Sequence, residues 1–143
     1  MLQSVVLAPV PCIYLESAMT VVSLSERVAF GSSHLGVPDL PVGLPVFIYA
    51  SMGPHGLFRL GRVSWTGTLG AIVPAVKGGQ RDGKHSDPAV RPPSAEANDT
   101  AFLFFWEVLG LHQLSPARPL RDFNSRVSLG EAPKWPTVAE LDM

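Results

Sequence analysis

This chain has a single cysteine, few charged residues and no long hydrophobic run. Cys12 is the one cysteine among 143 residues, which excludes an intramolecular disulfide and a zinc site made of cysteines. A lone cysteine is ordinarily a small buried apolar side chain, and this usage predicts a cytoplasmic protein. No apolar run approaches the roughly 18 residues that span a bilayer, so we expect no membrane segment.

The low charge limits what the protein can bind. Charged residues make up 16% of the chain and the net charge is −1, whereas about a quarter of an average domain is charged. No overall positive field attracts nucleic acid, so contact with it requires a local basic patch. A surface with few charges is often covered in an oligomer, and we expect a homodimer.

Patterns that carry catalysis or bind metals are weak. Residues 78–85 (GGQRDGKH) resemble a phosphate-binding loop, but His85 stands where the hydroxyl that ligates magnesium belongs, and three prolines downstream exclude the helix. The four histidines lie far apart in the sequence, and no nucleophile elbow occurs. Ser32, Ser33 and His34 are adjacent, which is not the geometry of a catalytic triad. We expect no catalytic residue, metal or cofactor and favour a non-enzymatic function, although the residues alone leave an enzyme open.

The amount of apolar residues, glycine and proline indicates the fold class. With 46% hydrophobic residues the chain is too apolar for disorder, and its length predicts one domain over residues 1–143. Glycine (13 residues) and proline (14) favour short strands and many turns. The predicted strands are residues 5–7, 12–15, 46–49, 57–63, 69–76 and 101–111. The predicted helices or helical turns are residues 17–28, 120–123 and 135–141, and the predicted loops are residues 29–45 and 115–119.

The clearest local signal is a hairpin over residues 46–63. An apolar strand, Val46–Tyr49, runs into a turn rich in glycine and proline at residues 52–56, and a second strand-like run returns. Two such runs joined by a loop with glycine are typical of a β-hairpin. Residues 65–68 then predict a turn or a bulge before the next strand.

Residues 77–100 differ in composition from the rest of the chain. They contain no aromatic residue and only four hydrophobic ones, three of which are alanine. Such a segment cannot bury enough apolar surface to offset its ordering entropy. It is predicted to be one long, flexible, polar surface loop.

Residues 101–111 form the most apolar run and are predicted to be a central strand. Alternation would place Phe102, Phe104 and Trp106 on one face, with Leu103, Phe105 and Glu107 on the other. A carboxylate in such a run must be paired or hydrogen-bonded if it is buried. We expect Glu107 to face out of the strand or to pair with Arg59 or Arg62.

Several short motifs occur in the order found in a known superfamily. Residues 30–34 (FGSSH) resemble an "F-x-x-x-H-G" stretch, and Val42–Gly43 with residues 46–49 resemble a "G-D-x-V-x-x-Y" strand. Phe58, Gly61 and Val63 resemble the next strand, "F-x-x-x-G-x-V", and residues 104–120 resemble a later "V…L…P-x-P-L" segment. With these motifs, residues 26–123 resemble the PUA-like superfamily, and its EVE and ASCH domains in particular.

This chain also departs from the pattern of that superfamily. Leu44 replaces the usual aspartate after Gly43, and the first strand lacks the usual Tyr-Trp pair. The lysines that ASCH-type enzymes use near the first helix are missing. This absence argues against the enzymatic activities of ASCH domains.

The resemblance implies an α+β fold: a small, twisted, mostly antiparallel β-barrel with short helices and the one long polar loop. In EVE-type domains a cleft accepts a base flipped out of a nucleic acid, held by stacking and by polar groups. The base-binding or ligand-binding residues implied here are Ser32, Ser33, His34, Tyr49, Ser51 and Trp65. The implied phosphate contacts are Arg27, Arg59 and Arg62, with Lys77, Arg81, Lys84 and Arg91 of the loop as further candidates.

The sequence therefore predicts a non-enzymatic nucleic-acid-binding module that reads a modified or flipped base in DNA or RNA. The alternative is a dimeric small-molecule or protein-interaction barrel without nucleic acid. A concave pocket lined by Tyr49, Ser51 and Trp65, with arginines at its rim, would favour the first function. A filled barrel that holds these aromatic rings in its core would favour the second.

Overall fold

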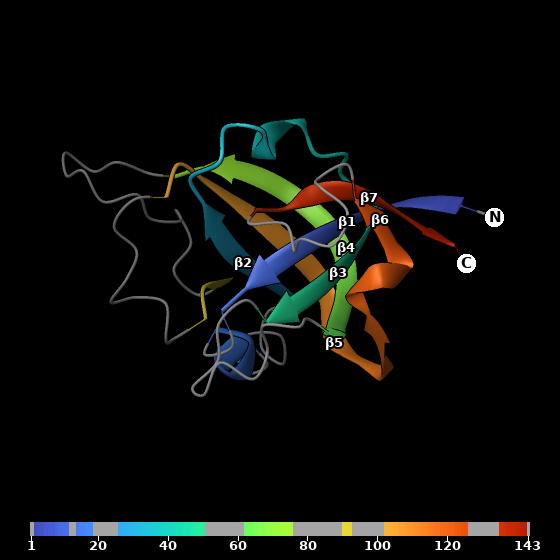
Figure 1. Cartoon of the computed structure of the whole chain (residues 1–143). Coiled ribbons are helices and arrows are strands. Elements are labelled where there is room, and N and C mark those ends of the chain that lie inside the picture. The colour runs from blue at the N-terminus through green and yellow to red at the C-terminus, as the bar shows by residue number, and fades with distance from the viewer. Residues whose placement is uncertain are drawn as a thin grey trace.

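The computed structural model describes residues 2–11, 14–18, 26–50, 62–75, 90–92, 102–125 and 135–142. Most of these residues are in strands, with a one-turn helix at residues 14–18 (Figure 1). The strands are β1 (Leu2–Val10), β2 (Arg27–Ser32), β3 (Pro45–Ala50), β4 (Arg62–Pro74), β5 (Phe104–Pro119), β6 (Phe123–Ser125) and β7 (Thr137–Asp142). Two 3-10 helices are η1 (Val37–Asp39) and η4 (Leu120–Asp122).

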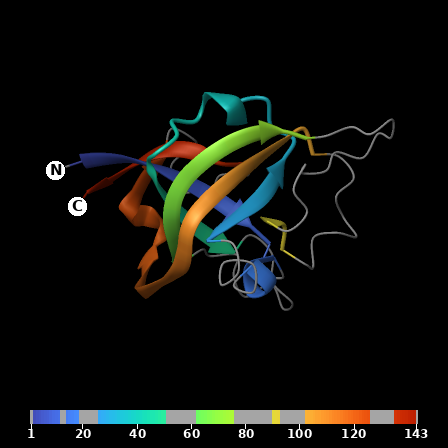
Figure 2. The same ribbon diagram turned by 180° about the vertical axis from the view of Figure 1, so that it is seen from behind.

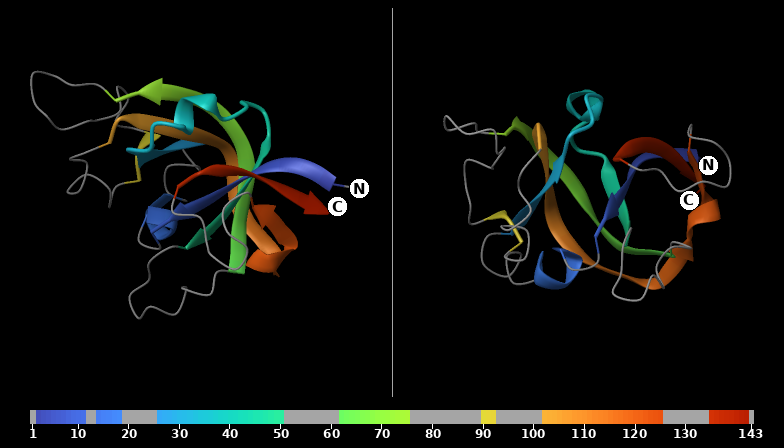
Figure 3. Two further views of the ribbon diagram at one scale, coloured as in Figure 1. Left: turned by 45° about the horizontal axis from the view of Figure 1, so that its top comes forward. Right: turned by 60° about the vertical axis from the view of Figure 1, so that its left-hand side comes forward.

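The strands form one sheet in the order β2-β5-β4-β3-β1-β7-β6. Every neighbouring pair is antiparallel except β1 and β3, which are parallel. The expectation of a mostly antiparallel β-structure is therefore confirmed. The closed barrel is not: β2 and β6 end the sheet, and among the described strands they do not pair with each other. The sheet instead bends strongly along β4 and β5 (Figures 2 and 3).

The bend encloses the main hydrophobic core. Side chains from β1 and β2, between which three other strands lie in the sheet, belong to one buried cluster together with Trp106 and Val108 of β5. Leu15 and Ala18 of the short helix enter this cluster, and so do Val37 and Leu40 at η1. We call this cluster the inner core. The helix and η1 therefore add apolar side chains to the core that the bent sheet encloses.

Two smaller clusters lie on the other face of the sheet. The first contains Val5 and Leu7 of β1, Phe47 and Tyr49 of β3, and residues of β6 and β7. The second contains Ala29 of β2, Phe105 of β5 and Val90. The two faces follow the alternation of strand residues, since neighbours such as Ile48 and Tyr49 enter different clusters.

The hairpin of residues 46–63 is confirmed in part. β3 and β4 pair antiparallel, with Ile48 opposite Trp65 and Tyr49 opposite Val63. The return strand was expected at residues 57–63, but residues 57–61 lie outside the described part. The separate strand predicted at residues 69–76 is wrong, because β4 continues through it.

Bulges explain how β4 runs through the predicted turn at residues 65–68. The pairing of β4 with β5 shifts register between Val63 and Trp65 and again between Thr66 and Thr68. Gly67 lies so close to β5 that a Cβ atom there would stand 2.5 Å from a methyl group of Val108. The bulge is therefore confirmed and the turn is not, since bulges bend a strand without ending it.

β5 confirms the predicted central strand and extends it. It pairs with β2 on one side and β4 on the other, and it continues through residues 115–119, where a loop was predicted. Phe104 and Trp106 face the inner core, and Phe105 faces the opposite side, as alternation predicts. Phe102 is the exception: it precedes the strand and packs with Phe105.

The predictions at the two ends of the chain have mixed outcomes. Tyr14 and Leu15 are helical instead of extended. Of the helix predicted at residues 17–28, Ser17 and Ala18 are helical and residues 19–25 lie outside the described part, but β2 begins at Arg27. The predicted terminal helix is β7, because pairing with β1 buries Ala139 and Leu141 in alternation. The helical turn at residues 120–123 is confirmed as η4.

The polar loop of residues 77–100 was expected to lie wholly on the surface, and this is wrong for residues 90–92. Val90, Arg91 and Pro92 are buried. Val90 joins Ala29 and Phe105 on the outer side of β2 and β5, which explains why these three residues are buried within so polar a sequence. The other residues of this loop lie outside the described part.

Candidate functional site

Two aromatic side chains from distant parts of the chain stack where the end of β2 meets the start of β7. His34 follows β2, and Trp135 precedes β7. Their ring centroids are 4.3 Å apart and their planes differ by 8°. Trp135 is 36% exposed, so part of its ring faces solvent. We call this pair the platform.

Hydrogen bonds within a tight turn fix the orientation of His34. Its Nδ1 accepts the N–H of Gly36 at 3.1 Å, and its own main-chain N–H donates to Oγ of Ser32 at 3.2 Å. A Cβ atom at Gly36 would stand 2.8 Å from Cε1 of the ring, which explains the glycine there. Because Nδ1 accepts this hydrogen bond, the neutral ring carries its proton on Nε2, and this N–H can donate to a ligand.

The segment that carries His34 is tied down in its middle and at its C-terminal end. We call residues 33–44 the cap loop. Val37 and Leu40 anchor its middle in the inner core. At its end the N–H of Gly43 donates to the carbonyl of Leu69 at 2.8 Å, and the N–H of Leu69 donates to the carbonyl of Leu44 at 2.9 Å. Gly43 has a φ of +97°, which a residue with a side chain rarely adopts.

The cap loop presents a surface that is apolar and almost uncharged. Leu35 is 75% exposed and Val42 is 63% exposed. Pro38 and Pro41 are exposed as well. Asp39 is the single charged residue in the cap loop. Such a surface suits an apolar ligand better than a phosphate backbone.

Tyr49 does not reach a ligand-binding surface. It is 3% exposed and lies in the cluster of Phe47 and Val63. Burial raises the pKa of its hydroxyl above the ordinary value. The expected role of this ring in stacking on a base therefore has no support from its position.

Trp65 lies on the opposite face of the sheet from Tyr49. It stands opposite Ile48 in the strand register, and it packs half-buried against the inner core. The two rings therefore do not form the walls of one cleft. Ser51, which was expected between them, lies outside the described residues.

The structure brings Ser32, Ser33 and His34 together in one turn, but it keeps the predicted arginines apart. Arg27 and Arg62 stand opposite Leu109 and Pro119 of β5, ten residues apart along that strand. At about 3.3 Å per residue this corresponds to roughly 30 Å along the strand. Arg59 lies outside the described residues.

Arg27 has a structural partner. Its Nη1 donates to Oε1 of Glu107 at 2.8 Å, and Glu107 is 3% exposed. Glu107 was predicted to face out of the strand or to pair with Arg59 or Arg62; it is buried and pairs with Arg27 instead. The strand register explains the difference, because Arg27 and Glu107 face the same side of neighbouring positions on β2 and β5.

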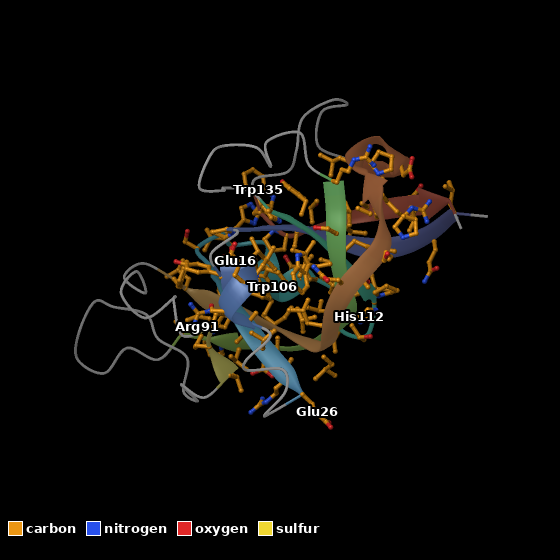
Figure 4. All side chains as sticks on the ribbon, turned by 90° about the horizontal axis from the view of Figure 1, so that it is seen from below. Glu16, Glu26, Arg91, Trp106, His112 and Trp135 are labelled. Atoms are coloured by element: carbon orange, nitrogen blue, oxygen red, sulfur yellow. The ribbon has the colours of Figure 1, made fainter. Side chains whose placement is uncertain are left out.

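The loop cations also give no basic patch in the described structure. Arg91 is buried beside β2 and lies away from both Trp135 and His112 (Figure 4). Lys77, Arg81 and Lys84 lie outside the described residues. Arg118 pairs with Asp122 at 3.3 Å, four residues further on.

Trp135 is the residue of this site that the sequence predictions missed. It was predicted to lie in a terminal helical turn, and nothing in that prediction brought its ring to His34. One available signal was Pro136, because a residue before proline disfavours the helical conformation. The stack itself could not be predicted, since it joins positions 101 residues apart by the course of the whole sheet.

Within the described residues, no group of three or more histidine, cysteine or acidic side chains is placed to hold a metal ion. In the same part of the chain, no helix has the length and apolarity required to cross a membrane. No protein-family model matches this chain, and neither curated proteins nor solved structures include a match to it.

Proposed function

We propose that this protein is a non-catalytic interaction module that binds an apolar, proline-containing segment of another protein on the platform. The observation that carries this proposal is the stack of His34 and Trp135, which is partly exposed and set beside an almost uncharged loop. A rigid aromatic ring offers a large contact area and loses little conformational entropy on binding. Proline segments suit such rings because the polyproline conformation exists before binding.

The preorganisation of the site supports the same function. His34 is fixed by its turn, and the cap loop is fixed by Val37, Leu40 and its bonds to Leu69. Little order has to be gained on binding, so more of the contact energy remains as affinity. The N–H at Nε2 of His34 can donate to a carbonyl of the bound segment, since polyproline backbones leave their carbonyls without internal partners.

Nucleic-acid binding is the second candidate, favoured by one observation. Ser32, Ser33 and His34, which were expected to contact a base, lie in one turn beside the exposed ring of Trp135. A base could stack on that ring. Phosphate contacts supply most of the affinity for nucleic acid, however. The cap loop offers only Asp39 as a charge, and Arg27 is engaged by Glu107.

We also infer that the bent sheet is a gapped form of the barrel that PUA-like domains have. The inner core supports this inference, because it joins β1 and β2 across the opening of the sheet. The platform lies at the same opening, since it links the end of β2 to the start of β7. A homodimer would form if a second copy of the chain packed against the apolar surface of the cap loop.

The test is a titration that follows the indole N–H signals of Trp65, Trp106 and Trp135 by NMR. The ligands are a proline-rich apolar peptide and plain or base-modified single-stranded DNA and RNA of eight nucleotides. We expect the peptide to shift the Trp135 signal and Trp135→Ala to abolish binding. Leu2→Ala is the matched control, because Leu2 is 55% exposed at the far end of β1 and its loss should leave affinity unchanged.

Other outcomes would decide between the candidates. Salt-sensitive oligonucleotide binding tighter than roughly 100 μM that moves the Trp135 signal would establish nucleic-acid binding instead. If the NMR signals of the protein alone broaden as its concentration rises, and Trp135→Ala abolishes this broadening, a second copy of the chain occupies the platform. Peptide binding that leaves the Trp135 signal in place would contradict the assigned site.

A further inference from the structure

The outer side of β2 and β5 carries a second candidate recognition site, separate from the platform. Residues 90–92 cover it, and we call these three residues the clip. Val90 is 1% exposed and lies in one cluster with Ala29 of β2 and Phe105 of β5. Phe102 packs at the border of the same cluster.

Arg91 makes a hydrogen bond and two contacts with aromatic rings on this face. Its Nη1 donates to the carbonyl of Ala29 at 2.6 Å. Its guanidinium carbon lies 4.6 Å from the ring centroid of Phe105 and 5.6 Å from that of Phe102. Both distances fall within the roughly 6 Å over which a cation and an aromatic ring attract each other. Arg91 is only 5% exposed, so these contacts offset much of the loss of hydration.

The sheet itself builds the walls of this site. Phe102 and Phe105 meet edge to face, with their centroids 5.7 Å apart. The Phe102 ring lies over Gly31 of β2, where a Cβ atom would overlap it. The Ala29 carbonyl and the Phe105 ring therefore belong to the paired strands β2 and β5, and Phe102 lies two residues before β5.

The clip owes its contact to its own three residues. Alanine is the only hydrophobic residue type in residues 77–89 and 93–100. Val90 is thus the one large apolar residue of the loop, and Arg91 beside it is buried. Arg91 and Ala29 are 62 positions apart. The contact therefore resembles the binding of a short linear motif more than the packing of a folded segment.

We propose that this face recognises the motif apolar residue–Arg–Pro, and that residues 90–92 occupy it within the same chain. A partner protein that carries this motif binds by displacing the clip. A guanidinium is specified because its flat, delocalised cation stacks on rings while it donates to a carbonyl, which an ammonium does less well. A partner motif must therefore bind this face strongly enough to displace the clip.

The strength of this competition follows from chain connection. A tethered motif competes at an effective concentration of the order of millimolar. A free peptide should therefore bind the intact chain poorly, with an apparent Kd of the order of millimolar, and bind a chain with a weakened clip with a Kd below about 0.1 mM. Removing the clip arginine is expected to tighten binding of the free peptide at least tenfold.

The experiment uses the full-length chain and a labelled peptide that copies residues 87–95 (DPAVRPPSA). Fluorescence anisotropy compares the unmodified chain with Arg91→Gln. A peptide in which glutamine replaces the arginine tests the need for the guanidinium. Arg118→Gln is the matched control, since this arginine pairs with Asp122 and stands opposite Val63, away from β2. It should bind the peptide as the unmodified chain does.

A second measurement covers the case in which Arg91→Gln does not fold. In the unmodified chain, millimolar peptide should shift the amide signals of Ala29 and Phe105, and the glutamine peptide should not. Equal affinity of the peptide for Arg91→Gln and the unmodified chain would overturn the proposal. Binding of the glutamine peptide with the same affinity, or absence of any shift at 10 mM peptide, would overturn it as well.

Discussion

At the scale of single residues, Tyr49 illustrates how burial changes the use of a side chain. The sequence places it in a strand that resembles a nucleic-acid-binding motif, which suggested an exposed ring. In the sheet it faces the cluster of Phe47 and Val63, where its hydroxyl is largely removed from water. Its role is therefore in stability, and this role has a pH signature.

Tyr49 should make the protein less stable at alkaline pH. Burial raises the pKa of its hydroxyl in the folded state above the value near 10 of an unfolded chain. Below pH 10 both states keep the proton, so stability is unaffected. Above it the unfolded state loses the proton while the folded state retains it, so the free energy of unfolding falls as pH rises.

The measurement is urea unfolding between pH 9 and pH 11 for the unmodified chain, Tyr49→Phe and Tyr14→Phe. Tyr14→Phe is the control, because it removes the other tyrosine and keeps Tyr49. We expect Tyr49→Phe to flatten the fall in stability above pH 10, and Tyr14→Phe to keep it. An identical slope in all three chains would contradict the assignment.

The pair of Arg27 and Glu107 belongs to the same scale. The carboxylate is 3% exposed, whereas the Arg27 side chain is 38% exposed, so solvent screens one side of the pair. Such a pair is coupled by about 0.5–3 kcal/mol in double-mutant cycles. We expect a value within this range for Arg27→Met and Glu107→Gln, measured by urea unfolding. Additive effects of the two substitutions would mean that the contact contributes no stability.

At the scale of elements, the clip is where composition and structure disagree. The count of hydrophobic residues in the loop is low, but one valine and one arginine suffice to bury residues 90–92 on β2 and β5. A composition averaged over the whole loop cannot reveal a contact made by three residues. Alternation, in contrast, correctly assigned Phe104, Phe105 and Trp106 of β5, because a strand paired on both sides obeys it.

Replacing residues 79–97 with a Gly/Ser linker should lower the melting temperature. The replacement removes Val90 and Arg91 from the outer face. Loss of the buried valine alone should lower the free energy of unfolding by about 1–2 kcal/mol. At this chain length each kcal/mol lowers the melting temperature by roughly 2–8 °C. The matched variant replaces residues 79–87 only and keeps the clip. Calorimetry should show little change for this variant, and equal melting temperatures of the two variants would contradict a role of the clip in stability.

Local patterns predicted the elements better than the connections between them. The hairpin of β3 and β4 and the central strand β5 follow from apolar runs and turn residues close together in the sequence. The parallel pairing of β1 with β3 and the pairing of β1 with β7 join distant segments, and no local residue pattern encodes them. His34 was proposed as a site residue from a short local motif, whereas Trp135, which reaches it only through the course of β7, was not.

At the scale of the whole molecule, the two ends of the chain hold the sheet together. β1 lies between β3 and β7, and Leu2 stands opposite Asp142, so both termini lie side by side (Figure 1). β7 in turn is the strand that joins β6 to the rest of the sheet. The same strand leads back to Trp135 and thus to the platform. Both the fold and the candidate site therefore depend on the pairing of β1 with β7.

Truncation before residue 135 should abolish cooperative folding. It would remove β7, expose Val5 and Leu7 of β1, and leave β6 without its partner strand. Each large side chain that loses full burial represents roughly 1.5–3 kcal/mol, and a domain of this size is stable by about 5–15 kcal/mol in total. The loss of Ala139 and Leu141 with their contacts thus consumes much of the available stability.

Amide hydrogen exchange and thermal unfolding measure this directly. Removal of Met143 alone is the control, and it should keep the protection of β1, β3 and β5 and a single cooperative transition. For the chain ending at residue 134 we expect fast exchange in β1 first, because its register with β7 runs from Leu2 to Leu7. If β1 remains protected in that truncated chain, its parallel pairing with β3 is sufficient, and the C-terminal strand serves mainly to position Trp135 against His34.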